Sequence, residues 1–94
     1  MELTLDCRTV ADRKQLHALL AEGLAFPAWY GANLDAMFDC LTDLHEPAEL
    51  RVLYPEALRE TLGNYADVWL RALRKAAEEN PRLTIIVAGE ETPE

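Results

Sequence analysis

The sequence predicts an α/β fold in which a three-stranded parallel sheet is flanked by about four helices. Extended apolar patterns occur near the start, the middle and the end of the 94-residue chain. Helical patterns fill both intervals between them, and helical connections between strands imply right-handed crossovers and parallel pairing. The last extended pattern is the most apolar, which predicts that the last strand lies in the middle of the sheet.

The first strand and the first helix are indicated by alternation and by a capping pattern. Residues 2–6 alternate between leucines and polar side chains, which is typical of a half-buried strand. Asp12 and Gln15 form a capping box, so a helix is predicted from there to about Leu24. Pro27 prevents this helix from continuing. Its apolar side is predicted at Leu16, Leu19 and Leu20.

A second helix and a second strand follow. Asn33 is a favourable N-cap, and the helical pattern after it predicts a helix at about residues 33–43. Pro47 comes after the end of this helix, and residues 49–54 are predicted to form a strand. The apolar side of the helix consists of Leu34, Met37, Phe38 and Leu41.

The last third of the chain predicts two more helices and a buried strand. Pro55 suits the first turn of a short helix, and Gly63 suits its end. Asn64 is predicted to cap a fourth helix, which Pro81 ends. The β-branched apolar run at 83–88 predicts a strand covered on both faces. The buried stripe of the fourth helix is predicted at Val68, Trp69, Ala72, Leu73 and Ala76.

Length and composition predict a single cytoplasmic domain at residues 1–89 and a flexible acidic tail at residues 90–94. The 50% hydrophobic content is that of a globular chain. No apolar run reaches the roughly 18 residues that a membrane span requires, and the N-terminus does not resemble a signal peptide. Cys7 and Cys40 lack metal-site or redox spacing, so they are expected to be buried thiols, and no cofactor is expected.

The charge distribution indicates a basic protein as the partner. The formal net charge is −8, which disfavours direct binding to nucleic acid or to an anionic membrane. No Lys or Arg occurs between Lys14 and Arg51. A region of one sign focuses its electric field and speeds the encounter with an oppositely charged partner. The acids in this stretch are Glu22, Asp35, Asp39, Asp43, Glu46 and Glu49.

An acidic stripe on the second predicted helix is the candidate for function. Asp35, Asp39 and Asp43 are spaced four residues apart and therefore share one helix face, with Thr42 beside them. Each like-charge pair at this spacing destabilises a helix by roughly 0.2–0.5 kcal/mol, and such local conflicts tend to mark functional surfaces. A solvated acidic face without a function is the ordinary alternative.

Two aromatic residues precede the stripe. Trp29 is predicted to be exposed and to contact a partner, because Trp and Tyr are enriched at interface hot spots. Tyr30 is predicted to be mostly buried, and Trp69 is predicted to lie in the core.

The run FPAWYGANLDAMFDCLT at residues 26–42 resembles the barstar family, whose members inhibit the bacterial ribonuclease barnase inside the cell. The resemblance extends over nearly the whole chain and implies a barstar-like sheet flanked by helices. It also implies that the helix and the loop before it plug a ribonuclease active site. In that site an inhibitor carboxylate would take the place of an RNA phosphate and accept hydrogen bonds from Arg and Lys.

The resemblance assigns roles to individual positions. It puts Asp39 in the central carboxylate role with Asp35 beside it, and Trp29 where barstar has a contacting Tyr. Glu46 matches a peripheral acidic contact. The other matching contact positions are Gly31, Asn33, Leu34 and Thr42.

Some positions depart from barstar. Phe38 stands where barstar has Trp, and Asp43 and Leu44 stand where it has Gly and Trp, which changes the end of the binding surface. Lys75 lies near an acidic contact position, and Glu79 offers an acid nearby. The predicted partner is a basic extracellular-type ribonuclease or a nuclease toxin. The predicted partner-binding set is Trp29, Gly31, Asn33, Leu34, Asp35, Phe38, Asp39, Thr42, Asp43, Glu46 and Glu79.

The same residues are compatible with three other functions. Asp35 and Asp39 could form an acid–base pair, but no pocket or nucleophile–base arrangement supports an enzyme. His17 is expected at the surface or at a flank of its helix. A metal site is not indicated, because Asp35, Asp39, His45 and Glu46 form no dense ligand pattern. The main alternative is a protein-interaction module or antitoxin of the same fold that binds a different basic protein.

Overall fold

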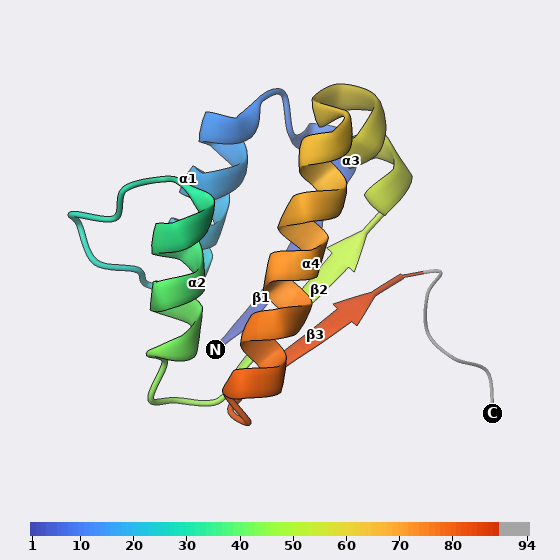
Figure 1. Cartoon of the computed structure of the whole chain (residues 1–94). Coiled ribbons are helices and arrows are strands. Elements are labelled where there is room, and N and C mark those ends of the chain that lie inside the picture. The colour runs from blue at the N-terminus through green and yellow to red at the C-terminus, as the bar shows by residue number, and fades with distance from the viewer. Residues whose placement is uncertain (89–94) are drawn as a thin grey trace, which may run out of the picture.

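A computed structural model describes residues 1–88 of the chain, and the tail predicted at residues 90–94 lies outside them. The described part confirms the predicted α/β class, with three parallel strands and four α-helices. The elements are β1 (Glu2–Asp6), η1 (Cys7–Thr9), α1 (Arg13–Gly23), α2 (Leu34–Thr42), β2 (Ala48–Leu53), α3 (Pro55–Leu62), α4 (Asn64–Glu79) and β3 (Leu83–Val87) (Figure 1).

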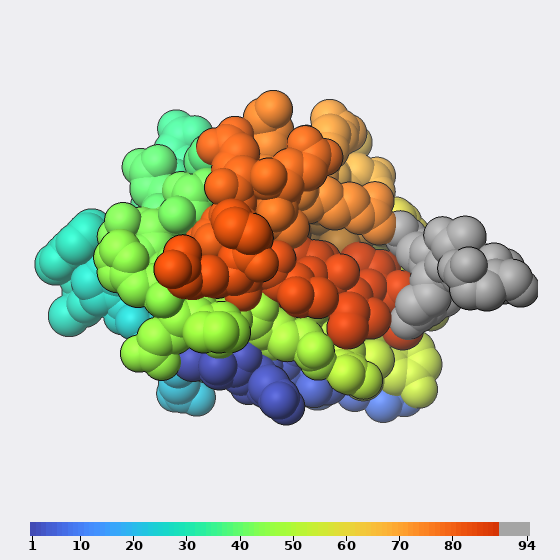
Figure 2. Space-filling view, turned by 90° about the horizontal axis from the view of Figure 1, so that it is seen from below, coloured from blue at the N-terminus to red at the C-terminus, as the bar shows by residue number. Residues whose placement is uncertain are grey.

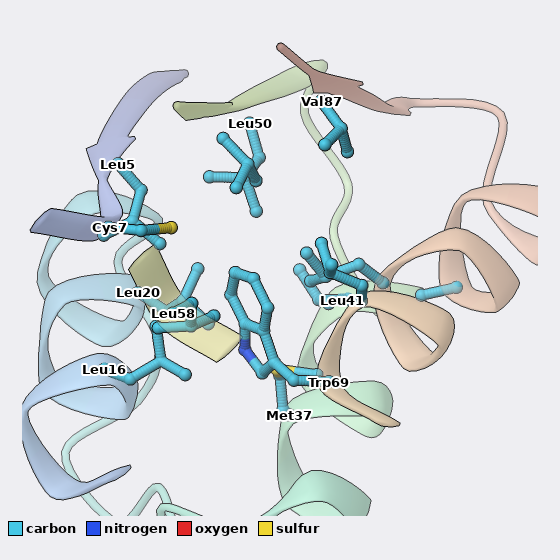
Figure 3. Packing of buried hydrophobic residues seen from close by; sticks show 14 of the residues in the cluster. Leu5, Cys7, Leu16, Leu20, Met37, Leu41, Leu50, Leu58, Trp69 and Val87 are labelled. Atoms are coloured by element: carbon cyan, nitrogen blue, oxygen red, sulfur yellow. The ribbon is translucent and has the colours of Figure 1, made fainter. Parts of the chain in front are cut away.

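The strand order is β1-β2-β3, so β2 is the central strand. Its Val52 pairs with Leu5 on one side and with Val87 on the other. This corrects the prediction that the last strand lies in the middle. A right-handed return to a central last strand would carry α3 and α4 to the opposite face of the sheet. With β3 outside β2, both crossovers advance in one direction, and the helices gather on one face (Figures 1 and 3).

The prediction that the last strand is covered on both faces is also wrong. In β3, Leu83 and Val87 are buried, whereas Thr84 is exposed and Ile86 is only half-buried. Ile86 pairs with exposed Arg51 of β2, on the opposite face of the sheet from the buried pair of Val52 and Val87. The apolarity of a strand therefore does not show whether it is central or at the edge of the sheet, because part of its apolar surface can remain on an open face.

The core lies between the sheet and the helices, and Trp69 of α4 is at its centre. Figure 3 shows the indole between leucines of α1 and α3 on one side and the α2 residues Met37 and Leu41 on the other. Trp69 has 0% exposure, which confirms its predicted core position. Its Nε1 has no hydrogen-bond partner among the described residues. This large buried ring therefore packs α4 against α2.

Two of the three predicted helix caps are confirmed. The Asp12 carboxylate accepts from the backbone N–H of Gln15 at 2.8 Å, and the Asn33 side chain accepts from that of Ala36 at 2.8 Å. The third prediction is wrong, because Asn64 is already the first residue of α4. Gly63, at φ 63°, is the only residue between α3 and α4, so the extended conformation of a side-chain cap has no room.

Candidate functional site

Helix α2 separates an apolar inner side from an acidic outer side. Met37 and Leu41 have 0% exposure and face the core. Asp35, Asp39 and Asp43 are exposed; we call them the acidic surface. The apolar periodicity that buries one side of the helix therefore directs the three carboxylates to solvent, as the sequence predicts.

The acidic surface is not neutralised by cations of the described residues. The ion pairs within residues 1–88 are Arg8–Asp6, Arg51–Glu49 and Arg59–Asp67, and all lie on other elements. The carboxylates of α2 therefore retain their full capacity to accept hydrogen bonds. A rigid helix holds them in place before any partner arrives, which lowers the entropic cost of binding.

The segment between α1 and α2, residues 24–33, extends away from the helices (Figure 1). We call it the connecting segment. Trp29 is 81% exposed, which confirms its predicted exposure, whereas Tyr30 is half-buried and packs against Phe26 with 4.9 Å between ring centroids. Ala25 and Ala32 have φ of 56° and 54°, a left-handed conformation that costs non-glycine residues about 1–2 kcal/mol each. The segment thus holds an exposed indole on a strained backbone.

A groove of about 620 Å³ lies between the connecting segment and α2. Trp29 and three carboxylates, those of Asp39, Asp43 and Glu46, take part in its lining, which contains no Lys or Arg side chain. The remaining lining residues are Met1, Leu24, Ala25, Phe26, Pro27, Ala36, Cys40, Thr42, Leu44 and His45. Figure 2 shows the connecting segment and α2, in teal and green, together at one end of the molecule. A lining that combines apolar side chains with three carboxylates suits a cationic side chain with an apolar stem.

Of the other residues in the predicted set, only Thr42 lines the groove; Gly31, Asn33, Leu34, Asp35 and Phe38 belong to α2 or the connecting segment outside the lining. Gly31 and Asn33 are exposed, and a Cβ at Gly31 would stand 3.2 Å from Asn33 Nδ2, so a larger residue would crowd the helix cap. Leu34 and Phe38 are half-buried and Asp35 is exposed on α2. Thr42 does line the groove, and its hydroxyl donates to the carbonyl oxygen of Phe38 at 2.9 Å.

Glu79 comes from α4 and is placed by its neighbour Asn80. Asn80 is 4% exposed, and its Nδ2 donates to the carbonyl oxygens of Leu41 at 2.9 Å and Leu44 at 3.2 Å. This amide holds the end of α4 against the end of α2, so the exposed Glu79 lies at the same end of the molecule as Asp43. No sequence pattern indicated Asn80, whose only local signal is its position before Pro81.

His17 does not lie at the surface, so that prediction is wrong. Its side chain is 1% exposed, with Nδ1 2.6 Å from the Tyr30 hydroxyl and Nε2 2.6 Å from the Tyr65 hydroxyl. Burial lowers the pKa of His17, which favours the neutral ring. The two tyrosines are far from His17 in the sequence, and no local pattern could have indicated the contact.

The thiols and carboxylates of the described residues are not arranged as a reactive or metal-binding centre. Cys7 is buried, which raises the pKa of its thiol to about 11. Cys40 is half-buried in the groove lining, and burial raises the pKa of its thiol too. Within residues 1–88 no three His, Cys, Asp or Glu side chains are placed to hold a metal ion. In the same range no helix is both long and apolar enough to cross a membrane.

Comparison with known proteins identifies relatives of this chain. Residues 1–89 match a family described as "Barstar (barnase inhibitor)". The chain is also 38% identical over 79 residues to a Bacillus subtilis (strain 168) protein named "Putative ribonuclease inhibitor YrdF". That match covers 83% of this chain and 87% of the Bacillus protein.

Proposed function

This chain belongs to the barstar family of barnase inhibitors, and from that premise we propose that it blocks a ribonuclease active site with α2 and the connecting segment. Inhibitors of this family are not enzymes, so the chain acts by binding. Because such an inhibitor protects cellular RNA, we place it in the cytoplasm with its target. The observation that carries the proposal is the position of Asp39, which is exposed, has no cationic partner within residues 1–88 and lies in the same groove as Trp29.

The physical argument rests on what a ribonuclease active site must hold. It binds an RNA phosphate, so it is lined by cations that donate hydrogen bonds to oxygen. Asp39 offers two carboxylate oxygens to the same donors, and Asp35 and Asp43 extend the negative potential along α2. Trp29 supplies an exposed aromatic surface that buries against the enzyme, as interface anchors do.

The test compares two substitutions that each remove one negative charge and keep the shape of the side chain. Asp39→Asn lies in the proposed contact, and Glu60→Gln lies at an exposed position of α3, away from α2. We expect Asp39→Asn to weaken inhibition of barnase at least about 30-fold, the effect of disrupting a buried charge pair at interfaces that include barnase–barstar itself. Glu60→Gln should change the inhibition constant by less than about threefold. Equal effects of the two substitutions would contradict the proposal.

A second candidate is that the same surface binds a basic nuclease toxin unlike barnase. What favours it is that Asp43 and Leu44, two departures from barstar, both line the groove, and that Lys75 is exposed on α4. In that case the chain would leave barnase active while retaining a basic nuclease on an affinity column. Asp39→Asn should abolish that retention, since the acidic surface is common to both candidates.

A further inference from the structure

The buried contacts of His17 join three elements that are separate in sequence. His17 belongs to α1, Tyr65 to the first turn of α4, and Tyr30 to the connecting segment. Both ring nitrogens are 2.6 Å from a tyrosine hydroxyl. The imidazole therefore connects the fixed body of the protein to the segment that carries Trp29.

His17, Tyr30 and Tyr65 satisfy both ring nitrogens of the imidazole with tyrosine hydroxyls. A neutral imidazole has one N–H donor and one acceptor nitrogen, whereas a tyrosine hydroxyl can donate or accept. One hydroxyl therefore accepts from His17 and the other donates to it, whichever tautomer is present. Removal of either hydroxyl leaves a buried nitrogen without its partner, which weakens the position of the ring and of the other tyrosine.

Tyr30 is the point at which the connecting segment is held. Its ring lies between Phe26, with 4.9 Å between centroids, and His17, with 5.8 Å between centroids. Ala25 and Ala32, both left-handed, stand on either side of it in the sequence. Strained backbone persists only where its surroundings determine it, and Tyr30 is the residue here that reaches inward to make hydrogen-bonded contact with buried His17.

We propose that His17 and Tyr65 are positioning residues of the binding surface, which act through Tyr30 to hold Trp29 and Gly31 in the geometry that the partner recognises. This inference rests on the proposed function for its partner, while the ordering of the connecting segment belongs to the protein alone. Neither His17 nor Tyr65 belongs to the predicted partner-binding set. Pre-organisation of this kind improves affinity without adding a contact.

The test uses Tyr65→Phe, which deletes one oxygen, and Tyr54→Phe as its matched control. Tyr54 is 43% exposed at the start of α3, where its ring contacts Arg8. In the protein without a partner, Tyr65→Phe should speed amide hydrogen exchange of residues 29–32 about three- to tenfold. That factor corresponds to the net contribution of about one hydrogen bond to the stability of the segment. Tyr54→Phe should leave exchange there unchanged. Circular dichroism establishes that both variants are folded under the conditions used.

Binding to barnase gives the second readout. Tyr65→Phe should raise the dissociation constant about three- to tenfold, mainly through faster dissociation. Tyr30→Phe and the double substitution complete a cycle. Because the two tyrosines act through one imidazole, the double variant should lose less than the product of the single effects.

The outcomes separate this inference from the proposed function. If the wild-type chain does not bind barnase, the proposed target is wrong, and hydrogen exchange still decides whether His17 and Tyr65 order the segment. Unchanged exchange in Tyr65→Phe would overturn the positioning role. Normal binding by Tyr65→Phe, or independent effects of the two tyrosines in the cycle, would overturn it equally.

Discussion

Asn80 shows how one buried side chain joins the two helices beside the acidic surface. Its amide donates to the carbonyl oxygen of Leu41 in α2 and to that of Leu44 just after the helix, and its own Oδ1 accepts from the backbone N–H of Arg82 at 3.0 Å. Carbonyl groups in the last turn of a helix lack partners within the helix. Asn80 donates to one such group, the carbonyl of Leu41, and to the carbonyl of Leu44 just beyond the helix, so it stabilises the end of the acidic surface.

Asn80→Ala should lower the free energy of unfolding by roughly 1–3 kcal/mol, because it removes a buried amide that bonds the carbonyl oxygens of Leu41 and Leu44. Urea denaturation measures the change. Asn64→Ala is the matched control, since the Asn64 side chain does not cap α4; it should stay within about 0.5 kcal/mol of wild type. Equal losses in the two variants would refute the role assigned to Asn80.

His17 should make the stability of the protein depend on pH. Burial lowers its pKa below the ordinary value of 6.5, so the unfolded chain takes up a proton at a pH where the folded chain does not. The free energy of unfolding therefore falls as the pH drops through about 6.5. Urea midpoints from about pH 8 to about pH 5 should decline less steeply in His17→Gln than in wild type. Parallel declines would show that His17 is not responsible.

At the scale of elements, α2 is a helix whose charges oppose its own stability. Asp35 in its first turn interacts favourably with the helix dipole, whereas Asp43 at its C-terminal end interacts unfavourably. Asp39 lies between them and repels both. The contacts of Met37 and Leu41 with the core offset this cost, so the acidic surface is maintained by tertiary packing.

Asp43→Asn should therefore stabilise the protein by roughly 0.3–1 kcal/mol while it slows association with the ribonuclease. Thermal unfolding measures the first effect. Asp35→Asn is the comparison at the other end of the helix, where loss of the dipole interaction cancels the relief of repulsion. A gain in Asp35→Asn as large as that in Asp43→Asn would contradict this account of α2.

The element scale also shows what the sequence could and could not predict. The caps at Asp12 and Asn33 were predictable, because each side chain bonds a backbone group three residues away. The outward direction of the acidic surface followed from the apolar period of α2. The strand order was not predictable from the apolarity of residues 83–88, because it depends on how two crossovers pack on one sheet.

The contacts that hold the site depend on residues distant in the chain. His17 is 13 residues from Tyr30 and 48 from Tyr65, and Asn80 is 39 from Leu41. Local patterns cannot indicate such pairs. A buried histidine in particular has the sequence environment of a surface residue, and only the packing of α1 against α4 and the connecting segment reveals its partners.

At the scale of the whole molecule, the separation of charge matters for encounter. The chain has a formal net charge of −8, and the groove at the α2 end has no Lys or Arg side chain in its lining. A basic ribonuclease is therefore attracted from a distance toward the surface that it is proposed to contact. The same field repels RNA, so the inhibitor does not itself bind the RNA substrate of the ribonuclease.

The association rate constant with barnase should fall about tenfold or more as ionic strength is raised from low to near-molar salt, while dissociation changes far less. Stopped-flow measurements with Trp29 fluorescence would follow the reaction. Asp39→Asn should reduce the salt dependence more than Glu60→Gln does, because only Asp39 lies at the proposed contact. An association rate that does not respond to salt would rule out electrostatic steering.

The most direct test of the central claim is competition between this protein and a mononucleotide 3′-phosphate for barnase, at constant ionic strength. If the carboxylates of α2 occupy the phosphate position, the apparent dissociation constant must rise in proportion to the mononucleotide concentration. An apparent dissociation constant that does not change at saturating mononucleotide would place the contact outside the active site and contradict the account.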